Sequence, residues 1–334
     1  MFCVRFQRII FRNLTSISER ARVVNNNNHK LTLVGVVPPA TSTINDNKLE
    51  DLSEVTPYFE ESFNLAAYVN KSELLQNLLH LGVDLNKIEK KKTFAVEKLL
   101  RLDLDINVKQ HVMFLKDYVE DIGKFVTNNP MILCEPIDNL KVRVNYLKSK
   151  KFSDDQIHQI VSKNAFWLML STQRIDRRLG YFQKSFELSG QEVRHLASQQ
   201  PKIITYNLHH IKTNSFVIKE EMGFEGNEVK KLILVKPKLW MINQKALLER
   251  FNYIHNTLKI SHETILLYPG VLLCRNFKVK QRHLFLEKLG RAQYNPKKEN
   301  YVPITALFED TDTEFSRKYA KCYVSDYNNF LKTI

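Results

Sequence analysis

Large apolar residues recur along the chain at fixed distances from a proline. Each repeating unit begins at one of five positions, and successive units are 35, 36, 36 and 32 residues apart. These positions are Pro130, Ala165, Pro201, Pro237 and Pro269. The residues at offsets 2 and 3 from each position are large and apolar, and further apolar residues follow at offsets 10, 16 and 17. A fixed period of this length is typical of a protein built from stacked helical repeats.

The prolines and capping residues of each unit predict three helices. A proline is tolerated in the first turn of a helix, so each unit is expected to begin with one. A second helix carries the apolar residues, and a short third helix is expected to begin near Ser153, Ser189, Glu225 and Ser261. Both Ser153 and Ser189 have Gln or Glu three residues later, which is the spacing of a capping box. Residues 81–88 resemble the end of an earlier unit and residues 93–129 a degenerate one, so six or seven repeats are expected.

Composition supports this interpretation. The chain has 9 glycines and 10 prolines in 334 residues, too few turn-forming residues for a fold of many strands. We therefore predict an all-α superhelical solenoid of repeats of about 35 residues, because stacked repeats bury a continuous core and present one long concave face.

The two ends of the chain depart from the repeat. Residues 1–30 hold six basic residues and one acidic residue, Glu19, which predicts a mitochondrial transit peptide; a disordered basic tail is the alternative. Residues 31–62 are expected to form a flexible acidic linker, and residues 63–290 the helical-repeat domain. Residues 291–334 break the period, which predicts a C-terminal helical cap with helices near 314–324 and 327–332.

The net charge restricts the possible ligands of the protein more than any sequence motif does. The net charge is +14, and since the leader contributes +5 and the linker −5, the whole excess remains in residues 63–334. Such a field attracts nucleic acid or an anionic membrane surface. The four cysteines form no metal-binding or disulfide pattern, and no apolar run is long enough to span a membrane. Nucleotide-binding loops and metalloprotease motifs are also missing, so we expect no catalytic residue, no cofactor and no metal.

Taken together, these units resemble the mitochondrial transcription termination factor (mTERF) family. The resemblance covers residues 78–290 and includes the Pro-initiated helix and a second helix with an arginine at offset 13. The endings Leu289–Pro296 and Phe330–Thr333 are similar to those of the third animal paralogue group of this family. Two positions depart from the family pattern, namely Ala165 in place of proline and Asn214 in place of arginine.

The resemblance implies a fold, a ligand and a compartment. The family implies a left-handed superhelix with two helices and one 3₁₀ turn per repeat, which binds double-stranded nucleic acid through a basic concave face in the mitochondrial matrix. The paralogue group implies repression of transcription initiation from mitochondrial DNA, with a further link to ribosomal RNA and assembly of the large ribosomal subunit. We expect a monomer.

Helical geometry separates the basic positions into two groups. Offset 13 lies beside the apolar stripe, so its arginines are expected first as scaffold residues that pair with helix-end carbonyls or acids of the neighbouring repeat. These are Arg143, Arg178, Arg250 and Arg282. Positions at offsets 11 and 12, or near the start of the second helix, are expected to contact phosphates, with a solvated side chain as the alternative for each. These are Lys141, Arg174, Arg177, Lys212, Lys245, Lys278 and Lys280.

Three functions remain open from the sequence. The first is a regulator of transcription that binds mitochondrial DNA, and the second is an assembly factor that binds ribosomal RNA together with ribosome-assembly proteins. The third is a protein-interaction solenoid, whose concave face would be apolar or of mixed charge. The aromatic residues of the repeats sit mainly at apolar positions, so we expect them in the core and assign none to base stacking.

Overall fold

The computed structural model describes residues 65–334. The expected transit peptide and acidic linker therefore lie outside the described residues. The chain divides after Asn77 into two units. The described part of the first comprises α2 (Leu65–Lys71) and the start of α3 (Glu73–His80). The second unit, Leu78–Ile334, holds the repeats and the C-terminal segment.

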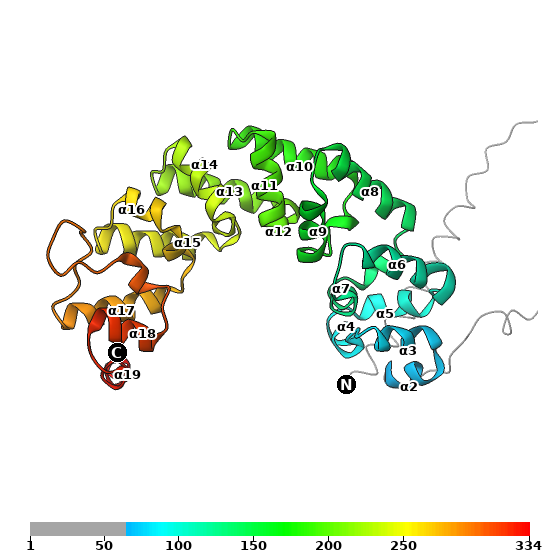
Figure 1. The fold of residues 1–334 in the computed structure, drawn as a ribbon, viewed down its shortest axis with the longest axis horizontal. Coiled ribbons are helices and arrows are strands. Elements are labelled where there is room, and N and C mark those ends of the chain that lie inside the picture. Colours follow the sequence, from blue (N-terminus) through cyan, green and yellow to red (C-terminus); the bar gives the residue numbers. More distant parts are fainter. Residues whose placement is uncertain (1–64) are drawn as a thin grey trace, which may run out of the picture. The chain divides into compact units, whose positions relative to one another are not determined.

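Residues 65–334 contain helices and turns and no strand, which confirms the all-α prediction (Figure 1). Ahead of Pro130 the elements are α4 (Leu85–Lys91), α5 (Thr93–Leu100), the π-helix η3 (Leu104–Lys109), α6 (Gln110–Lys116) and α7 (Ile122–Asn128). After Lys288 they are the 3₁₀ helix η10 (Ile304–Leu307), α18 (Asp312–Phe315), the π-helix η11 (Ser316–Ala320) and α19 (Val324–Leu331). The helical residues 312–320 and 324–331 lie within a few residues of the predicted ranges 314–324 and 327–332, whereas η10 was not predicted.

Each repeat consists of one short turn and two helices. The turns are η4 (Pro130–Cys134), η5 (Trp167–Met169), α12 (Pro201–Thr205), η7 (Pro237–Met241) and η9 (Pro269–Leu273). The second helices are α8 (Ile137–Ser149), α10 (Thr172–Ser185), α13 (Leu208–Phe216) with η6 (Val217–Glu221), α15 (Gln244–Phe251) with η8 (Asn252–Thr257), and α17 (Asn276–Lys288). The third helices are α9 (Asp154–Lys163), α11 (Gly190–Gln199), α14 (Gly226–Val235) and α16 (His262–Leu267).

Each complete repeat has the predicted two helices and one short element, but the short element is the first, whereas the sequence interpretation had it as the third. The proline-initiated element is a single short turn, whereas three of the four elements expected to be short are ten-residue α-helices. The turn is short because the cap of the next helix follows at once, as where Ser171 accepts a hydrogen bond from the backbone of Arg174 and Asn243 from that of Ala246. The capping boxes at Ser153 and Ser189 form as predicted.

A left-handed residue separates the second and third helices of the four complete repeats, and one also follows the second helix of the Pro269 unit. These residues are Lys151, Glu187, Gly223 and Lys259, followed by Gly290 after α17. A residue with positive φ lets the next backbone N–H reach back to a helix carbonyl, as Phe152 does to Leu147 at 3.2 Å. The residue after the left-handed position is buried in the four complete repeats, where Phe152, Leu188, Phe224 and Ile260 occupy it. This turn directs the third helix back onto the core.

The core runs through the second unit along the apolar offsets. The residues at offsets 2 and 3 are almost fully buried in all five units, with Trp167 and Trp240 the largest of them. Third helices of consecutive repeats pack on one another, α9 on α11, α11 on α14 and α14 on α16. Each repeat therefore completes the core of the one before it, as expected for a stacked array.

Candidate nucleic-acid interface

The offset-13 arginines point toward the next repeat. The guanidinium of Arg178 donates to the Tyr206 carbonyl at 3.0 Å, and that of Arg250 donates to the Leu272 carbonyl at 3.0 Å. Arg143 donates to the Leu168 carbonyl and forms an ion pair with Glu135 at 2.5 Å. In each case the acceptor carbonyl lies in or directly after the short first turn of the following repeat. These contacts are of the kind that a scaffold arginine is expected to make.

The asparagine that departs from the family pattern occupies the same site. Asn214 is fully buried, and its amide nitrogen donates to the carbonyls of Trp240 at 3.1 Å and Ile242 at 2.9 Å. A neutral amide therefore replaces a guanidinium at offset 13 while keeping the contact with the next turn.

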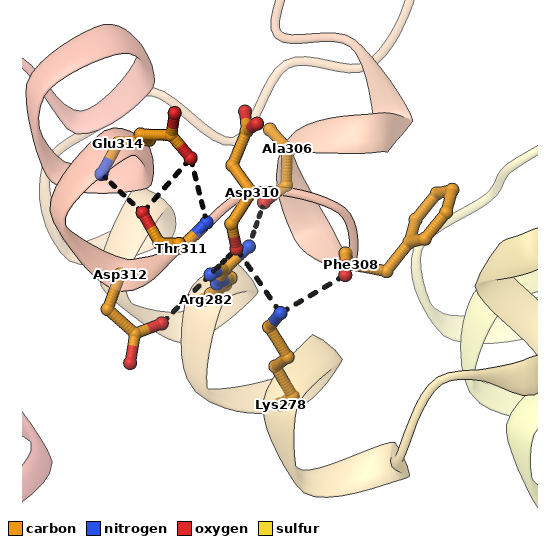
Figure 2. Close-up of polar contacts among 8 residues, drawn as sticks. All are labelled: Lys278, Arg282, Ala306, Phe308, Asp310, Thr311, Asp312 and Glu314. Atoms are coloured by element: carbon orange, nitrogen blue, oxygen red, sulfur yellow. Dashed lines mark hydrogen bonds and ion pairs between the residues drawn. The ribbon is translucent and has the colours of Figure 1, made fainter.

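The last member of the series, Arg282, joins α17 to the C-terminal segment. Figure 2 shows its side chain surrounded by the carbonyls of Ala306 and Asp310 and the carboxylate of Asp312. The distances are 2.8 Å to Ala306 O and 2.8 Å to Asp312 Oδ1, and Arg282 is fully buried. The segment after Lys288 thus supplies the acceptors that a following repeat would otherwise supply.

Lys278 lies in this cluster too, although the sequence predicted a phosphate contact there. Its ammonium donates to the carbonyls of Phe308 at 3.1 Å and Asp310 at 3.3 Å (Figure 2). His210 has the same offset, 9, and contacts the Ile242 carbonyl at 2.8 Å. Offset 9 therefore faces the next turn in these two repeats. The Lys278 ammonium is held by these carbonyls, so Lys278 acts as a scaffold residue and does not belong to the proposed interface.

The other six basic positions expected to contact phosphates have exposed side chains. They are Lys141, Arg174, Arg177, Lys212, Lys245 and Lys280. Arg174 also has offset 9, but its side chain is exposed. Burial lowers the pKa of Arg178, and the positive charge of Arg174 lowers it further. Lys141 lies 3.7 Å from Asp138 in an exposed ion pair, which stabilises little and leaves the ammonium available.

Two of these lysines lie over tyrosine rings of the preceding repeat. The Lys212 ammonium lies 5.7 Å from the centre of the Tyr181 ring, and the Lys280 ammonium lies 5.1 Å from that of Tyr253. Each pair joins offset 11 of one repeat to offset 16 of the repeat before it. A cation over an aromatic face is attracted by the ring, which limits the motion of a long side chain while its charge stays exposed.

Asp176 has the same offset in the Ala165 unit, and the sequence interpretation missed it. Its carboxylate accepts from the Tyr146 hydroxyl at 2.6 Å and pairs with the Lys150 ammonium at 2.8 Å. The hydrogen bond from Lys150, followed by that from Tyr146, lowers the pKa of Asp176. Offset 11 therefore holds lysine in the Pro130, Pro201 and Pro269 units and aspartate or leucine in the two between. Aligning all five units at this offset would have shown the alternation.

A second group of lysines surrounds a cleft of about 470 Å³ in the Ala165 region. Lys124, Lys163 and Lys202 line it together with Phe166. Lys124 lies near the start of α7, Lys163 at the end of α9 and Lys202 in the turn α12. None of them is on a second helix, where the sequence interpretation placed the phosphate contacts. Within residues 65–334, no group of three metal-ligating side chains gathers anywhere, and no helix is long and apolar enough to cross a membrane.

Comparison with known proteins gives one family. The mTERF family profile matches residues 67–224 and 135–316. The chain is 41% identical to "Transcription termination factor 3, mitochondrial" of Drosophila melanogaster, over the full length of both proteins. It is 40% identical to the protein of that name from Rattus norvegicus and 39% to that from Mus musculus, over 96% of this chain and 80% and 79% of theirs. The resemblance seen in the endings of the sequence is thereby confirmed.

Proposed function

This chain belongs to the mTERF family, and we propose that it binds double-stranded mitochondrial DNA and represses the initiation of transcription in the mitochondrial matrix. Members of the family are non-enzymatic nucleic-acid-binding factors. The relatives reported above are named as mitochondrial transcription termination factors, which supports a mitochondrial location and a role in transcription.

One observation carries the proposal: exposed lysines recur at the same offset in alternate repeats. Lys212 and Lys280 share offset 11, and each is held over a tyrosine of the preceding repeat. A row of cations with a constant spacing suits a ligand whose negative charges are also evenly spaced, as are the phosphates of a duplex. Arg174 and Arg177 on α10 and Lys245 on α15 add exposed charge on the second helices of the two units that lack a lysine at offset 11.

Contacts of this kind position a protein on nucleic acid without reading the bases. Phosphate contacts supply affinity and register, whereas sequence is read at base edges or through the shape of the duplex. The protein is therefore expected to bind duplexes of many sequences with similar affinity. Repression then follows from occupying DNA that the transcription machinery needs.

The test is to identify the nucleic acid bound in mitochondria. Epitope-tagged protein is crosslinked in intact organelles and purified, and bound DNA and RNA are sequenced separately. The proposal predicts enriched reads from mitochondrial DNA that include the regions where transcription begins. Reads confined to ribosomal RNA would overturn it in favour of ribosome assembly, and recovery of proteins without nucleic acid would favour a protein-interaction solenoid.

A further inference from the structure

Four successive units contribute residues to the cleft of about 470 Å³ described above. Lys124 comes from α7, Lys163 from the end of α9, Phe166 from the turn of the Ala165 unit and Lys202 from α12. The helix α12 packs on α9, and α7 packs on the turn η4. The volume of the cleft lies within the usual range of sites for small organic ligands. A ligand bound here would contact all four units at once.

The lysines of the cleft have ammonium groups that the protein holds weakly or not at all. Within residues 65–334, no acceptor or ion-pair partner engages the ammonium of Lys124 or that of Lys202. The Lys163 ammonium donates to the Gln159 side chain at 3.4 Å and to the Ser198 carbonyl at 3.5 Å, which are long distances for hydrogen bonds. Positive charges at one cleft repel one another, and a bound anion offsets this repulsion. The cleft therefore suits a ligand with several negative charges.

Hydrogen bonds between the turns hold the floor of the cleft in place. The Asn164 side-chain oxygen accepts from the Phe166 N–H at 3.2 Å, and its amide donates to the Thr205 hydroxyl of α12 at 2.9 Å. The Asn129 amide donates to the Ala165 carbonyl at 2.9 Å. Both asparagines are buried. The turns that border the cleft are thus fixed before a ligand arrives, so little ordering is needed on binding.

Two acids lie on the wall of the same cleft, Glu120 and Asp121. The carboxylate of Asp121 accepts the backbone N–H of Lys124 at 2.7 Å and so caps α7. Glu120 is exposed, and no ion pair within the described part of the chain engages it. Carboxylates repel a bare anion, but proteins use one or two of them to bind the Mg²⁺ ion that accompanies di- and triphosphates. Lysines and carboxylates in one cleft therefore favour a magnesium-bound oligophosphate.

Phe166 gives the cleft an apolar side. The sequence led us to expect this ring in the core, but it is 49% exposed, whereas Trp167 and Leu168 beside it are fully buried. The Lys92 ammonium lies 5.5 Å from the centre of the ring while donating to the Asn128 carbonyl. An apolar surface next to the lysines can also accept the organic group of a phosphate ester.

We propose that this cleft binds a small magnesium-bound oligophosphate, with its phosphates among Lys124, Lys163 and Lys202 and its metal ion at Glu120 and Asp121. The ligand is a free molecule and not part of a bound nucleic acid, because none of these residues is on a second helix, where the phosphate contacts of a duplex are expected. Binding ties four units together and so stabilises this part of the array against local opening. The inference does not depend on the proposed function.

The experiment measures binding of two probes by isothermal titration calorimetry, at about 150 mM salt so that distant surface charges are screened. The probes are inorganic tripolyphosphate and ATP, each titrated into the full chain with Mg²⁺ and again with EDTA. The variants are K124Q/K202Q and E120Q. The matched control is K298Q/K332Q, which loses the same charge at exposed lysines outside the cleft.

The unaltered protein is expected to bind one ligand per chain in Mg²⁺ and to bind it more weakly in EDTA, because the carboxylates then repel the phosphates. K124Q/K202Q should weaken binding by at least about tenfold, the effect of losing hydrogen bonds from charged donors. E120Q should weaken binding by about threefold in Mg²⁺ and strengthen it in EDTA, a reversal that a purely structural role of Glu120 would not give. K298Q/K332Q should bind as the unaltered protein does. Tighter binding of ATP than of tripolyphosphate identifies an ester whose organic group contributes, and equal binding identifies the phosphate chain alone as the ligand.

Equal losses of affinity in K124Q/K202Q and K298Q/K332Q would show that the probes respond only to net charge, and would overturn the site. A greater loss of duplex affinity in K124Q/K202Q than in K298Q/K332Q would place the cleft in the nucleic-acid interface and would also overturn it. Thermal melting without ligand checks that K124Q/K202Q is folded; if it is not, the reversal in E120Q decides. Failure of the unaltered protein to bind a duplex would overturn the proposed function and not this site.

Discussion

Replacing Arg282 with methionine should destabilise the C-terminal segment. The loss of stability should be larger than that caused by replacing any other offset-13 arginine with methionine. Arg282 is fully buried, whereas Arg178 is only half-buried. Methionine keeps much of the apolar stem, so the change removes chiefly the charge and its hydrogen bonds. What is lost is the guanidinium that donates to the carbonyls of Ala306 and Asp310 and pairs with Asp312 (Figure 2).

The magnitude follows from these three partners. A hydrogen bond from a charged donor contributes about 1.5–3 kcal/mol net, and here two carbonyls lose one each. The Asp312 side chain is 51% exposed, so its ion pair adds less than about 1 kcal/mol. Removing the buried charge recovers part of its desolvation cost, which lowers the sum. We expect R282M to lose about 3 kcal/mol, and R178M, with one carbonyl partner, about 1 kcal/mol.

Amide hydrogen exchange resolves this effect by segment, which matters because repeat proteins can open locally. Peptides covering residues 302–331 should exchange about a hundredfold faster in R282M, the equivalent of about 3 kcal/mol. Peptides covering α8 to α11 should be unchanged. If the exchange of peptides covering residues 302–331 were no faster in R282M than in R178M, Arg282 would not be the residue that joins the C-terminal segment to the repeats.

Three further changes test the local structure. D176N should lower the melting temperature at neutral pH, because the folded protein holds the pKa of Asp176 below its ordinary value of 3.8. The ionised carboxylate stabilises the fold above pH 3.8, and this stabilisation is lost as the pH falls through the lower pKa of the folded state. The difference in melting temperature between D176N and the unaltered protein should therefore narrow below pH 3.8. A165P should stabilise the protein by about 0.4–1 kcal/mol in urea unfolding, because Asn164 already has nearly the backbone angles of Asn129 before Pro130; a loss of stability would contradict this. S189A should cost about 1 kcal/mol by removing the cap of α11, whereas S162A, which removes an exposed hydroxyl within α9, should change stability by less than about 0.5 kcal/mol.

Periodicity alone was enough to predict the repeats and their buried residues. The offsets that carry Trp167, Trp240 and the apolar pairs of the second helix are fixed by the stacking of one unit on the next. The scaffold contacts of Arg178 and Arg250 could also be anticipated, since offset 13 lies at the edge of the apolar stripe. The lengths of the first turns could not be predicted, because they depend on where the N-cap residue of the second helix lies.

Two features of the candidate interface depend on contacts with a neighbouring repeat or with the C-terminal segment, and a third depends on the direction in which a side chain points. Lys278 points inward because the segment after Lys288 places carbonyls beside it. Asp176 is paired because Tyr146 and Lys150 of the preceding unit reach it. Phe166 is exposed because offset 1 faces away from the core, a direction that its apolar character alone does not reveal.

The salt dependence of duplex binding tests most directly whether the exposed lysines of the repeats hold phosphates. The dissociation constant of one duplex is measured between about 50 and 200 mM salt. The proteins compared are the unaltered chain, K212Q/K280Q, and K298Q/K332Q, which loses the same charge at exposed lysines after α17. The account predicts steep salt dependence, with a log–log slope reduced by about 1.8 in K212Q/K280Q and unchanged in K298Q/K332Q. A slope near zero for the unaltered protein, or equal reductions in both double variants, would contradict it.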